Sequence, residues 1–266
     1  MQFPTIQQRL ALRSNPAAGR HVMLQKWRDL LFLHWEIDPH VIQSTLPEGL
    51  FVDSFKSKAY VGVVPFWMVD IRPRFCPPIP PVSNFLEMNV RTYVHDARGT
   101  PGVWFYSLDA NQHLAVKLAR AGFKLPYFFA KMEAEKLPAT GEIRFRCERD
   151  SGEVGFTSEF LYRPMGETFS SVPGGLEFFL IERYLLYAYG NGRLFSGRVF
   201  HKPYVLQKVE ARKWDSNALR QNGFDVGDSP PDHAVCSKGV SVKVFALQKN
   251  SALKYPPSRH TPSLRA

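Results

Sequence analysis

The sequence contains little cysteine, no long apolar run and no secretion signal. Its three cysteines, Cys76, Cys147 and Cys236, are widely separated, so they form neither a disulfide framework nor a paired metal-ligand spacing. No apolar run approaches the roughly 20 residues that a membrane helix needs. Residues 1–9 also lack the apolar core of a secretory signal. These absences predict a cytoplasmic protein with reduced thiols and no membrane partner.

Several catalytic motifs are missing as well. The chain has neither Gly-x-Gly-x-x-Gly nor a phosphate-binding loop, and it lacks the His-Glu-x-x-His motif of hydrolytic zinc sites. Neither Ser107 nor Ser237 stands in a Gly-x-Ser-x-Gly setting. We therefore expect no bound metal, no cofactor and no serine-hydrolase chemistry.

Positive charge, by contrast, is in excess. The net charge is +10 and the isoelectric point is near 9.6, a balance that suits nucleic acid or an anionic surface. The basic residues are spread along the whole chain, however, and no zinc-finger spacing or aromatic RNA-binding signature accompanies them. A basic nucleic-acid-associated protein is therefore only a weaker alternative.

The order of apolar segments and turn residues predicts a mainly β (α+β) protein with a few short helices. Strands are expected at 30–37, 59–68, 86–94, 103–108, 127–135, 142–149, 156–163 and 239–247, with two more between 185 and 213. Helices are expected at 38–43, 111–122 and 176–184. This pattern is typical of an antiparallel β-barrel or sandwich carrying helices.

No internal repeat or linker divides this pattern. We expect residues 25–248 to form one domain, after a loosely ordered lead-in at residues 1–24. Residues 249–266 mix basic residues with prolines and are expected to be a disordered tail. The composition leaves open whether the chain forms a homo-oligomer.

The predicted strand from Leu86 to Val94 has the most informative pattern. Its polar residues Glu87, Asn89, Arg91 and Tyr93 alternate with apolar ones, so an acid, an amide, a guanidinium and a phenol share one face. Antiparallel sheets often leave one face in water. The row is therefore either a solvated outer face or the polar wall of a ligand cavity.

Four segments resemble the YqjF-like family of uncharacterised bacterial proteins: 46–50 (LPEGL), 87–93 (EMNVRTY), 102–109 (GVWFYSLD) and 125–130 (LPYFFA). The resemblance covers most of residues 25–247, and its Glu-x-Asn-x-Arg-Thr-Tyr block is the most specific part. The family has no established activity. Its fold is similar to that of acetoacetate decarboxylase, so the resemblance implies an acetoacetate decarboxylase-like antiparallel β-barrel that encloses a small-acid pocket.

The same resemblance implies positions for the site and one decisive difference. An active-site arginine of the decarboxylases falls on Arg28 and an active-site glutamate on Glu87. The lysine that forms their Schiff base falls on Tyr127, and the second lysine falls on Phe128. A phenol cannot form an imine, so decarboxylation through a lysine imine is not expected.

Non-covalent acid/base chemistry of the lyase or isomerase type remains. Glu87 would be the general acid or base, and Tyr127 would donate a hydrogen bond to a carbonyl or enolate oxygen. The expected substrate-binding residues are Arg28, Asn89, Arg91 and Tyr93. The alternatives are a purely structural Glu87–Arg91 ion pair and a core role for Tyr127.

The sequence thus predicts a barrel that binds a small organic acid or other oxygenated metabolite in a polar-walled pocket. A different class of function, a non-catalytic small-ligand-binding or sensing module, fits the same pattern. Turnover that depends on Glu87 would distinguish the two.

Overall fold

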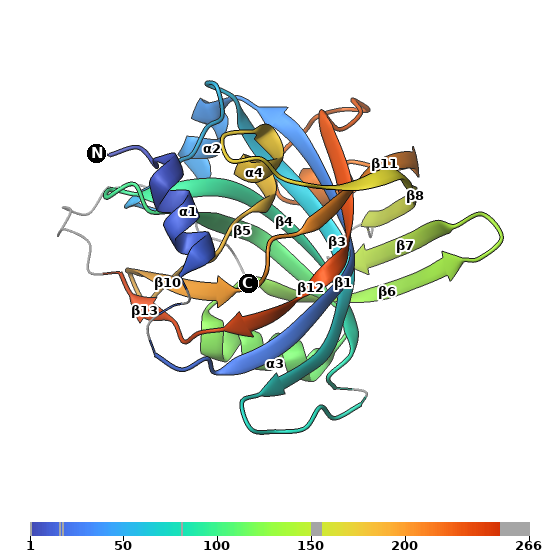
Figure 1. The fold of residues 1–266 in the computed structure, drawn as a ribbon, viewed down its shortest axis with the longest axis horizontal. Coiled ribbons are helices and arrows are strands. Elements are labelled where there is room, and N and C mark those ends of the chain that lie inside the picture. The colour runs from blue at the N-terminus through green and yellow to red at the C-terminus, as the bar shows by residue number, and fades with distance from the viewer. Residues whose placement is uncertain (1, 16, 18, 81, 150–155, 251–266) are drawn as a thin grey trace.

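A computed structural model gives the fold and describes residues 2–15, 17, 19–80, 82–149 and 156–250 (Figure 1). Thirteen strands of this part form a single sheet. The strands are β1 (Met23–Ile37), β2 (Leu50–Val52), β3 (Ala59–Pro73), β4 (Phe85–Asp96), β5 (Pro101–Ala110), β6 (Tyr127–Leu137), β7 (Glu142–Arg149), β8 (Phe156–Ser170), β9 (Leu185–Gly190), β10 (Arg193–Phe200), β11 (Val205–Lys213), β12 (His233–Val244) and β13 (Gln248–Lys249). The predicted mainly β fold is confirmed.

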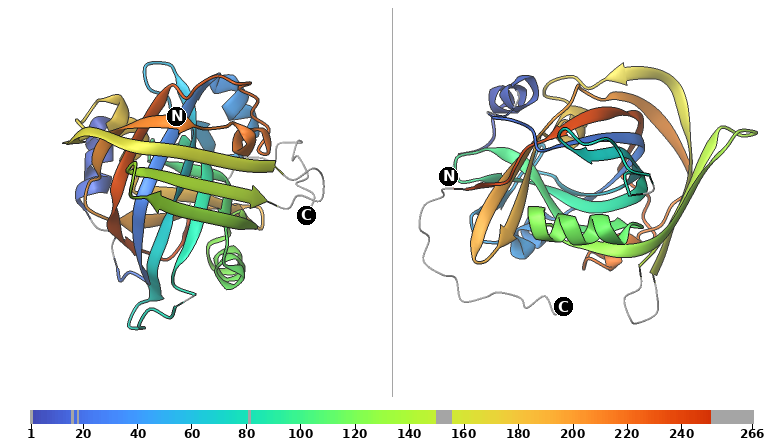
Figure 2. Two further views of the ribbon diagram at one scale, coloured as in Figure 1. Left: turned by 90° about the vertical axis from the view of Figure 1, so that its right-hand side faces the viewer. Right: turned by 90° about the horizontal axis from the view of Figure 1, so that it is seen from below.

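The sheet closes on itself. Its strand order is β13-β10-β9-β5-β6-β7-β8-β11-β12-β1-β3-β4-β2, and β4 also pairs with β5 along its length. Nearly all pairs are antiparallel, as expected, but β5 pairs in parallel with both β6 and β9. The views in Figure 2 show the strands curving around an enclosed interior.

Closure gives the sheet an inner and an outer apolar core, with two smaller apolar clusters beside them. The inner core includes Phe32, Tyr93 and Leu206, and the outer core includes Leu31 and Phe145, all fully buried. Neighbouring residues of β1 therefore enter different cores. This is why the strand is a continuous apolar run and does not alternate with polar residues.

Five helices accompany the sheet in the described part: α1 (Ile6–Ser14), α2 (Pro39–Thr45), α3 (His113–Phe123), α4 (Leu176–Ile181) and α5 (Asn217–Arg220). Helix α2 begins as predicted, because the side chain of Asp38 caps it by accepting a hydrogen bond from the His40 amide. None of these described helices is long and apolar enough to cross a membrane.

The lead-in expected at residues 1–24 requires correction. Residues 6–14 form α1, which begins with a capping box in which Thr5 and Gln8 satisfy each other's backbone amides. Arg9 then joins the helix to the body through an ion pair of 2.8 Å with Asp53. Strand β1 also begins earlier than expected, at Met23. Of the expected disordered tail, residues 251–266 lie outside the described residues.

Candidate functional site

A cavity of about 360 Å³ lies inside the closed sheet, within the range of about 300–1,000 Å³ that is usual for small-molecule sites. Strands β1, β3, β4 and β5 supply much of its wall, and the rest comes from α3, the β3–β4 connection, β9 and single residues of other elements. Most of its lining is apolar, and the few polar or charged side chains are Gln25, Ser83, Glu87, Asn89, Arg91, Tyr127, Arg183 and Tyr204. The expected polar wall is therefore a small set of polar groups in an apolar cavity.

Strand β4 carries the polar row into this cavity. Glu87, Asn89 and Arg91 line it, whereas Met88 and Val90 point the other way into the outer core. Glu87 is only 3% exposed and Asn89 only 5%. The predicted alternation is thus found in the structure, and the solvated-face alternative is excluded.

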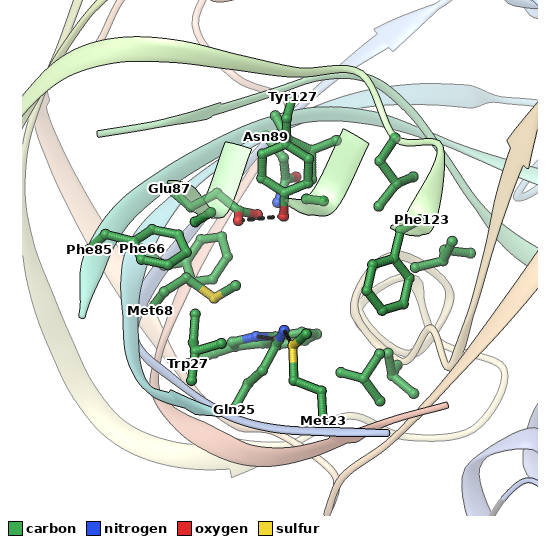
Figure 3. Close-up of a pocket in the computed structure, with 18 of the residues that line it drawn as sticks. Met23, Gln25, Trp27, Phe66, Met68, Phe85, Glu87, Asn89, Phe123 and Tyr127 are labelled. Carbon is green, nitrogen blue, oxygen red and sulfur yellow. Dashed lines mark hydrogen bonds between the residues drawn. The ribbon is translucent and has the colours of Figure 1, made fainter. Parts of the chain in front are cut away.

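Glu87 is a buried acid without a charged partner among the described residues. Its Oε2 accepts a hydrogen bond of 2.8 Å from the Tyr127 hydroxyl, as Figure 3 shows. Burial raises the pKa of Glu87 to about 7, and repulsion from Asp109 adds to this rise; Tyr127 and the Asn89 amide oppose it. A carboxyl with this pKa exchanges protons readily near neutral pH.

Tyr127 is positioned by the turn between α3 and β6. Lys124 ends α3 in the left-handed conformation, and Tyr127 then opens β6 in parallel register with Leu108. The Nε atom of Arg120 donates a hydrogen bond of 2.6 Å to the Tyr127 carbonyl oxygen. Burial and the adjacent Glu87 carboxylate raise the pKa of Tyr127 well above its ordinary value, so its hydroxyl stays protonated and acts as a donor.

Arg91 lines the cavity but does not contact Glu87. Its guanidinium lies over the rings of Phe32 and Tyr93, at 5.5 and 5.8 Å from their centroids. Two of its nitrogen atoms, Nε and Nη2, are buried and lack a hydrogen-bond partner within the described part of the chain. The alternative of a structural Glu87–Arg91 ion pair is therefore not found.

Two expected ligand contacts lie elsewhere. The Nη1 atom of Arg28 donates to the carbonyl oxygens of Trp27 and Val240, and it is Trp27, not Arg28, that lines the cavity. Tyr93 is fully buried in the inner core, where its hydroxyl bonds to Nε2 of His34 at 2.6 Å. Neither Arg28 nor Tyr93 is part of the cavity lining.

Arg183 is a cavity residue that the sequence analysis missed. It follows α4, is 7% exposed and donates a hydrogen bond of 2.7 Å to Oδ2 of Asp53. Its guanidinium stacks on Tyr93 at 4.8 Å from the ring centroid. The adjacent charges Glu182 and Arg183, set inside an apolar run, were the available signal.

The lining contains none of the groups needed for imine formation in the part of the chain that is described. No lysine is among the described residues that line the cavity. Lys131, the nearest lysine in sequence to Tyr127 on β6, is exposed. Phe128 packs against the guanidinium of Arg149, whose carbon lies 4.3 Å from the ring centroid.

The architecture has known counterparts among acetoacetate decarboxylase-like proteins. An acetoacetate decarboxylase-like enzyme from Sphingomonas wittichii RW1 matches with a TM-score of 0.60 and 14% identity, covering 90% of this chain and 97% of that one. Acetoacetate decarboxylase from Legionella pneumophila matches at 0.59 and 13%, covering 90% and 93%. The enduracididine biosynthesis enzyme MppR, solved in complex with pyruvate, matches at 0.58 and 11%, covering 89% and 93%. The chain has this fold.

Sequence comparison identifies the family. Residues 24–241 match DUF2071, described as an uncharacterized conserved protein. The uncharacterized protein YqjF of Bacillus subtilis (strain 168) is 35% identical over 213 residues, which are 80% of this chain and 86% of YqjF. The chain belongs to the DUF2071 family.

Proposed function

We propose that the cavity binds a small organic acid or related oxygenated metabolite and that Glu87 exchanges a proton with it. One observation carries this proposal: Glu87 is a buried carboxyl that lines a cavity, lacks a cationic partner among the described residues and has a pKa of about 7. Perturbed acids of this kind are typical of functional sites. The pyruvate complex of MppR supports a ligand with a carbonyl group.

The chemistry requires only two side chains. In its ionised form Glu87 removes a proton from the carbon next to a carbonyl, and the electron pair of that C–H bond moves into an enolate. Once protonated, Glu87 is a weaker acceptor for the Tyr127 hydroxyl, which then donates to the enolate oxygen. Return of the proton to the same or a neighbouring carbon gives exchange or isomerisation.

This route does not use an imine. Tyr127 lies where the resemblance places the decarboxylase lysine, and no lysine amine is present in the described lining. A reaction at this site therefore depends on acid/base catalysis and on placement of the ligand, without a covalent intermediate. Such a cavity fits a cytoplasmic metabolite-processing protein.

The test is proton exchange. The full chain is incubated in D2O with pyruvate, 2-oxobutanoate, acetoacetate or acetone, and loss of the proton signals next to the carbonyl is followed by NMR. We expect enzyme-dependent exchange that rises as the pH increases through about 7. Glu87→Gln should lower its rate by roughly 10²–10⁴-fold.

A thermal-shift measurement with the same compounds separates binding from turnover. A ligand at about 100 times its dissociation constant stabilises the fold by roughly 2.7 kcal/mol. Stabilisation without exchange at any pH would favour the rival function, a non-catalytic ligand-binding module. Exchange that persists unchanged in Glu87→Gln would contradict the proposed role of this residue.

A further inference from the structure

Arg91 carries a positive charge into the cavity without an acidic partner. Its Nε and Nη2 atoms are buried and make no hydrogen bond within the described residues. Burying such donor atoms without a partner is energetically costly. The unpaired donors of Arg91 therefore form a candidate binding site for an anion.

The other charges near this end of the cavity already have hydrogen-bond partners. Asp53 accepts hydrogen bonds from both Arg9 and Arg183, although Nη1 of Arg9 and Nη2 of Arg183 are buried without a partner among the described residues. Glu182 accepts hydrogen bonds from a tyrosine hydroxyl and a backbone amide. Burial lowers the pKa of His34 well below its usual range, so this side chain is neutral. An anion at Arg91 would thus meet a cation whose charge is not used elsewhere.

Arg91 and Glu87 also lie far apart. They are four residues apart on β4, so their Cα atoms are separated by about 13 Å, at roughly 3.3 Å per strand residue. The Arg91 guanidinium leans toward Tyr93, which lies two residues farther along the strand from Glu87. A ligand that contacts both side chains must therefore carry two polar groups separated by a spacer.

Apart from Asn89, which lies between the two side chains on the same face of β4, the neighbouring wall is apolar. It includes Val64, Phe66, Val103, Phe105 and Leu108. The cavity volume of about 360 Å³ equals the liquid volume of on the order of twelve water molecules. If each ligand heavy atom takes about the space of one water, the cavity holds a ligand with about twice as many heavy atoms as pyruvate. The spacer should be a hydrocarbon chain.

We infer that the ligand is an amphipathic monocarboxylic acid: its carboxylate binds Arg91, and its apolar chain carries a carbonyl group to Glu87 and Tyr127. This inference rests on the proposed function and specifies its substrate class. A guanidinium matches a carboxylate through two parallel hydrogen bonds. One unmatched cation balances a monoanion better than a phosphate dianion. The carboxylate is thus remote from the reacting carbon, unlike that of pyruvate.

Calorimetric titration of the full chain with butanoate, hexanoate and octanoate tests the assignment, with octan-1-ol and octyl phosphate as comparisons. We expect affinity to rise roughly fourfold for each added CH₂ group, and so about 15-fold from hexanoate to octanoate. Octan-1-ol and octyl phosphate should both bind more weakly than octanoate. Equal affinity for all three acids, or tighter binding of either comparison compound, would overturn the assignment.

Variants locate the carboxylate. Arg91→Gln should weaken octanoate binding at least tenfold and leave octan-1-ol binding unchanged, whereas the exposed-site control Lys131→Gln should alter neither. Arg91→Lys keeps the charge but loses the paired hydrogen bonds, so it should bind octanoate with an affinity between those of wild type and Arg91→Gln. If Arg91→Gln does not fold, a loss of octanoate affinity in Arg91→Lys serves instead. Wild-type octanoate affinity in both Arg91 variants would reject the assignment.

Exchange rates separate this inference from the proposed chemistry. Wild type should exchange the protons next to the carbonyl of 7-oxooctanoate faster than those of 2-oxooctanoate, in which the carboxylate adjoins the carbonyl. No exchange with either acid, while the order of binding affinities holds, would reject the chemistry and support the ligand class. Faster exchange of 2-oxooctanoate would reject the ligand class and retain the chemistry.

Discussion

The two faces of the β4–β5 pair hold buried charges in different ways. On the outer face Asp109, opposite Met88, receives hydrogen bonds of 2.5 and 2.6 Å from Arg149. On the inner face Glu87 and Arg91 both line the cavity, and neither has a charged partner among the described residues. A matched pair needs nothing further to be stable, whereas two separated charges leave room for a ligand.

The matched pair should be the more important for folding. Arg149→Met leaves the buried Asp109 carboxylate without its cation, and we expect the free energy of unfolding to fall by about 3–5 kcal/mol in urea titrations. Arg144→Met, which removes an exposed ion pair with Glu135, is the control and should cost less than about 1 kcal/mol. Equal losses in both variants would remove the distinction between the faces.

Glu87, by contrast, should lower the stability of the fold above neutral pH. Its pKa is about 7 in the fold, against an ordinary value of 4.5. Below pH 4.5 it is protonated in both folded and unfolded chains and carries no penalty. As the pH rises from 4.5 to about 7, the unfolded chain ionises before the folded one, so the fold becomes less stable by roughly 3 kcal/mol.

Glu87→Gln removes this penalty. We expect the variant to match wild type in unfolding free energy at pH 4 and to exceed it by roughly 3 kcal/mol at pH 8. Urea titrations at both pH values check this. A variant that is less stable than wild type at pH 8 would mean that the ionised carboxylate is favoured by the fold.

The two cavity arginines extend the comparison within the inner face. Arg183 donates hydrogen bonds to Asp53 and to the Phe179 carbonyl oxygen, so Arg183→Gln should cost about 1.5–3 kcal/mol. The measurement is again denaturant unfolding. A negligible loss would show that Arg9 alone is a sufficient partner for Asp53.

Arg91→Gln should have the smallest effect on stability. No described acid pairs with this arginine, so its removal breaks no ion pair and relieves two unpaired buried donors; it should not lower the free energy of unfolding by more than about 1 kcal/mol. The same denaturant titration, without added ligand, compares it directly with Arg183→Gln. A loss of 3 kcal/mol or more would assign Arg91 a structural role.

The sequence predicted most strands and the alternation on β4, because a period of two is a local property of the chain. It could not decide whether the polar face of β4 meets water or lines a cavity, because that depends on closure of the sheet through pairing with β5. Helix α1 could have been predicted from the Thr5–Gln8 capping box.

The positions of Arg28 and Arg183 relative to the cavity could not be predicted from periodicity, for a physical reason. Asp29 adopts a positive φ of 49°, and the β1–β3 register shifts after Arg28, so simple alternation does not hold there. Arg183 lies in a connection between α4 and β9, and only the closed fold brings it to the cavity. Neither the irregularity in β1 nor the position of Arg183 in a connection produces a periodic pattern in the sequence.

The most direct test of the account is the titration of Glu87 itself. Infrared difference spectra between wild type and Glu87→Gln, recorded from pH 4 to 9, isolate the carboxyl absorption of this residue. The account predicts a protonated carboxyl that ionises with a midpoint at about pH 7. A midpoint near the ordinary value of 4.5 would contradict it, since Glu87 would then be a permanently charged carboxylate unsuited to proton exchange.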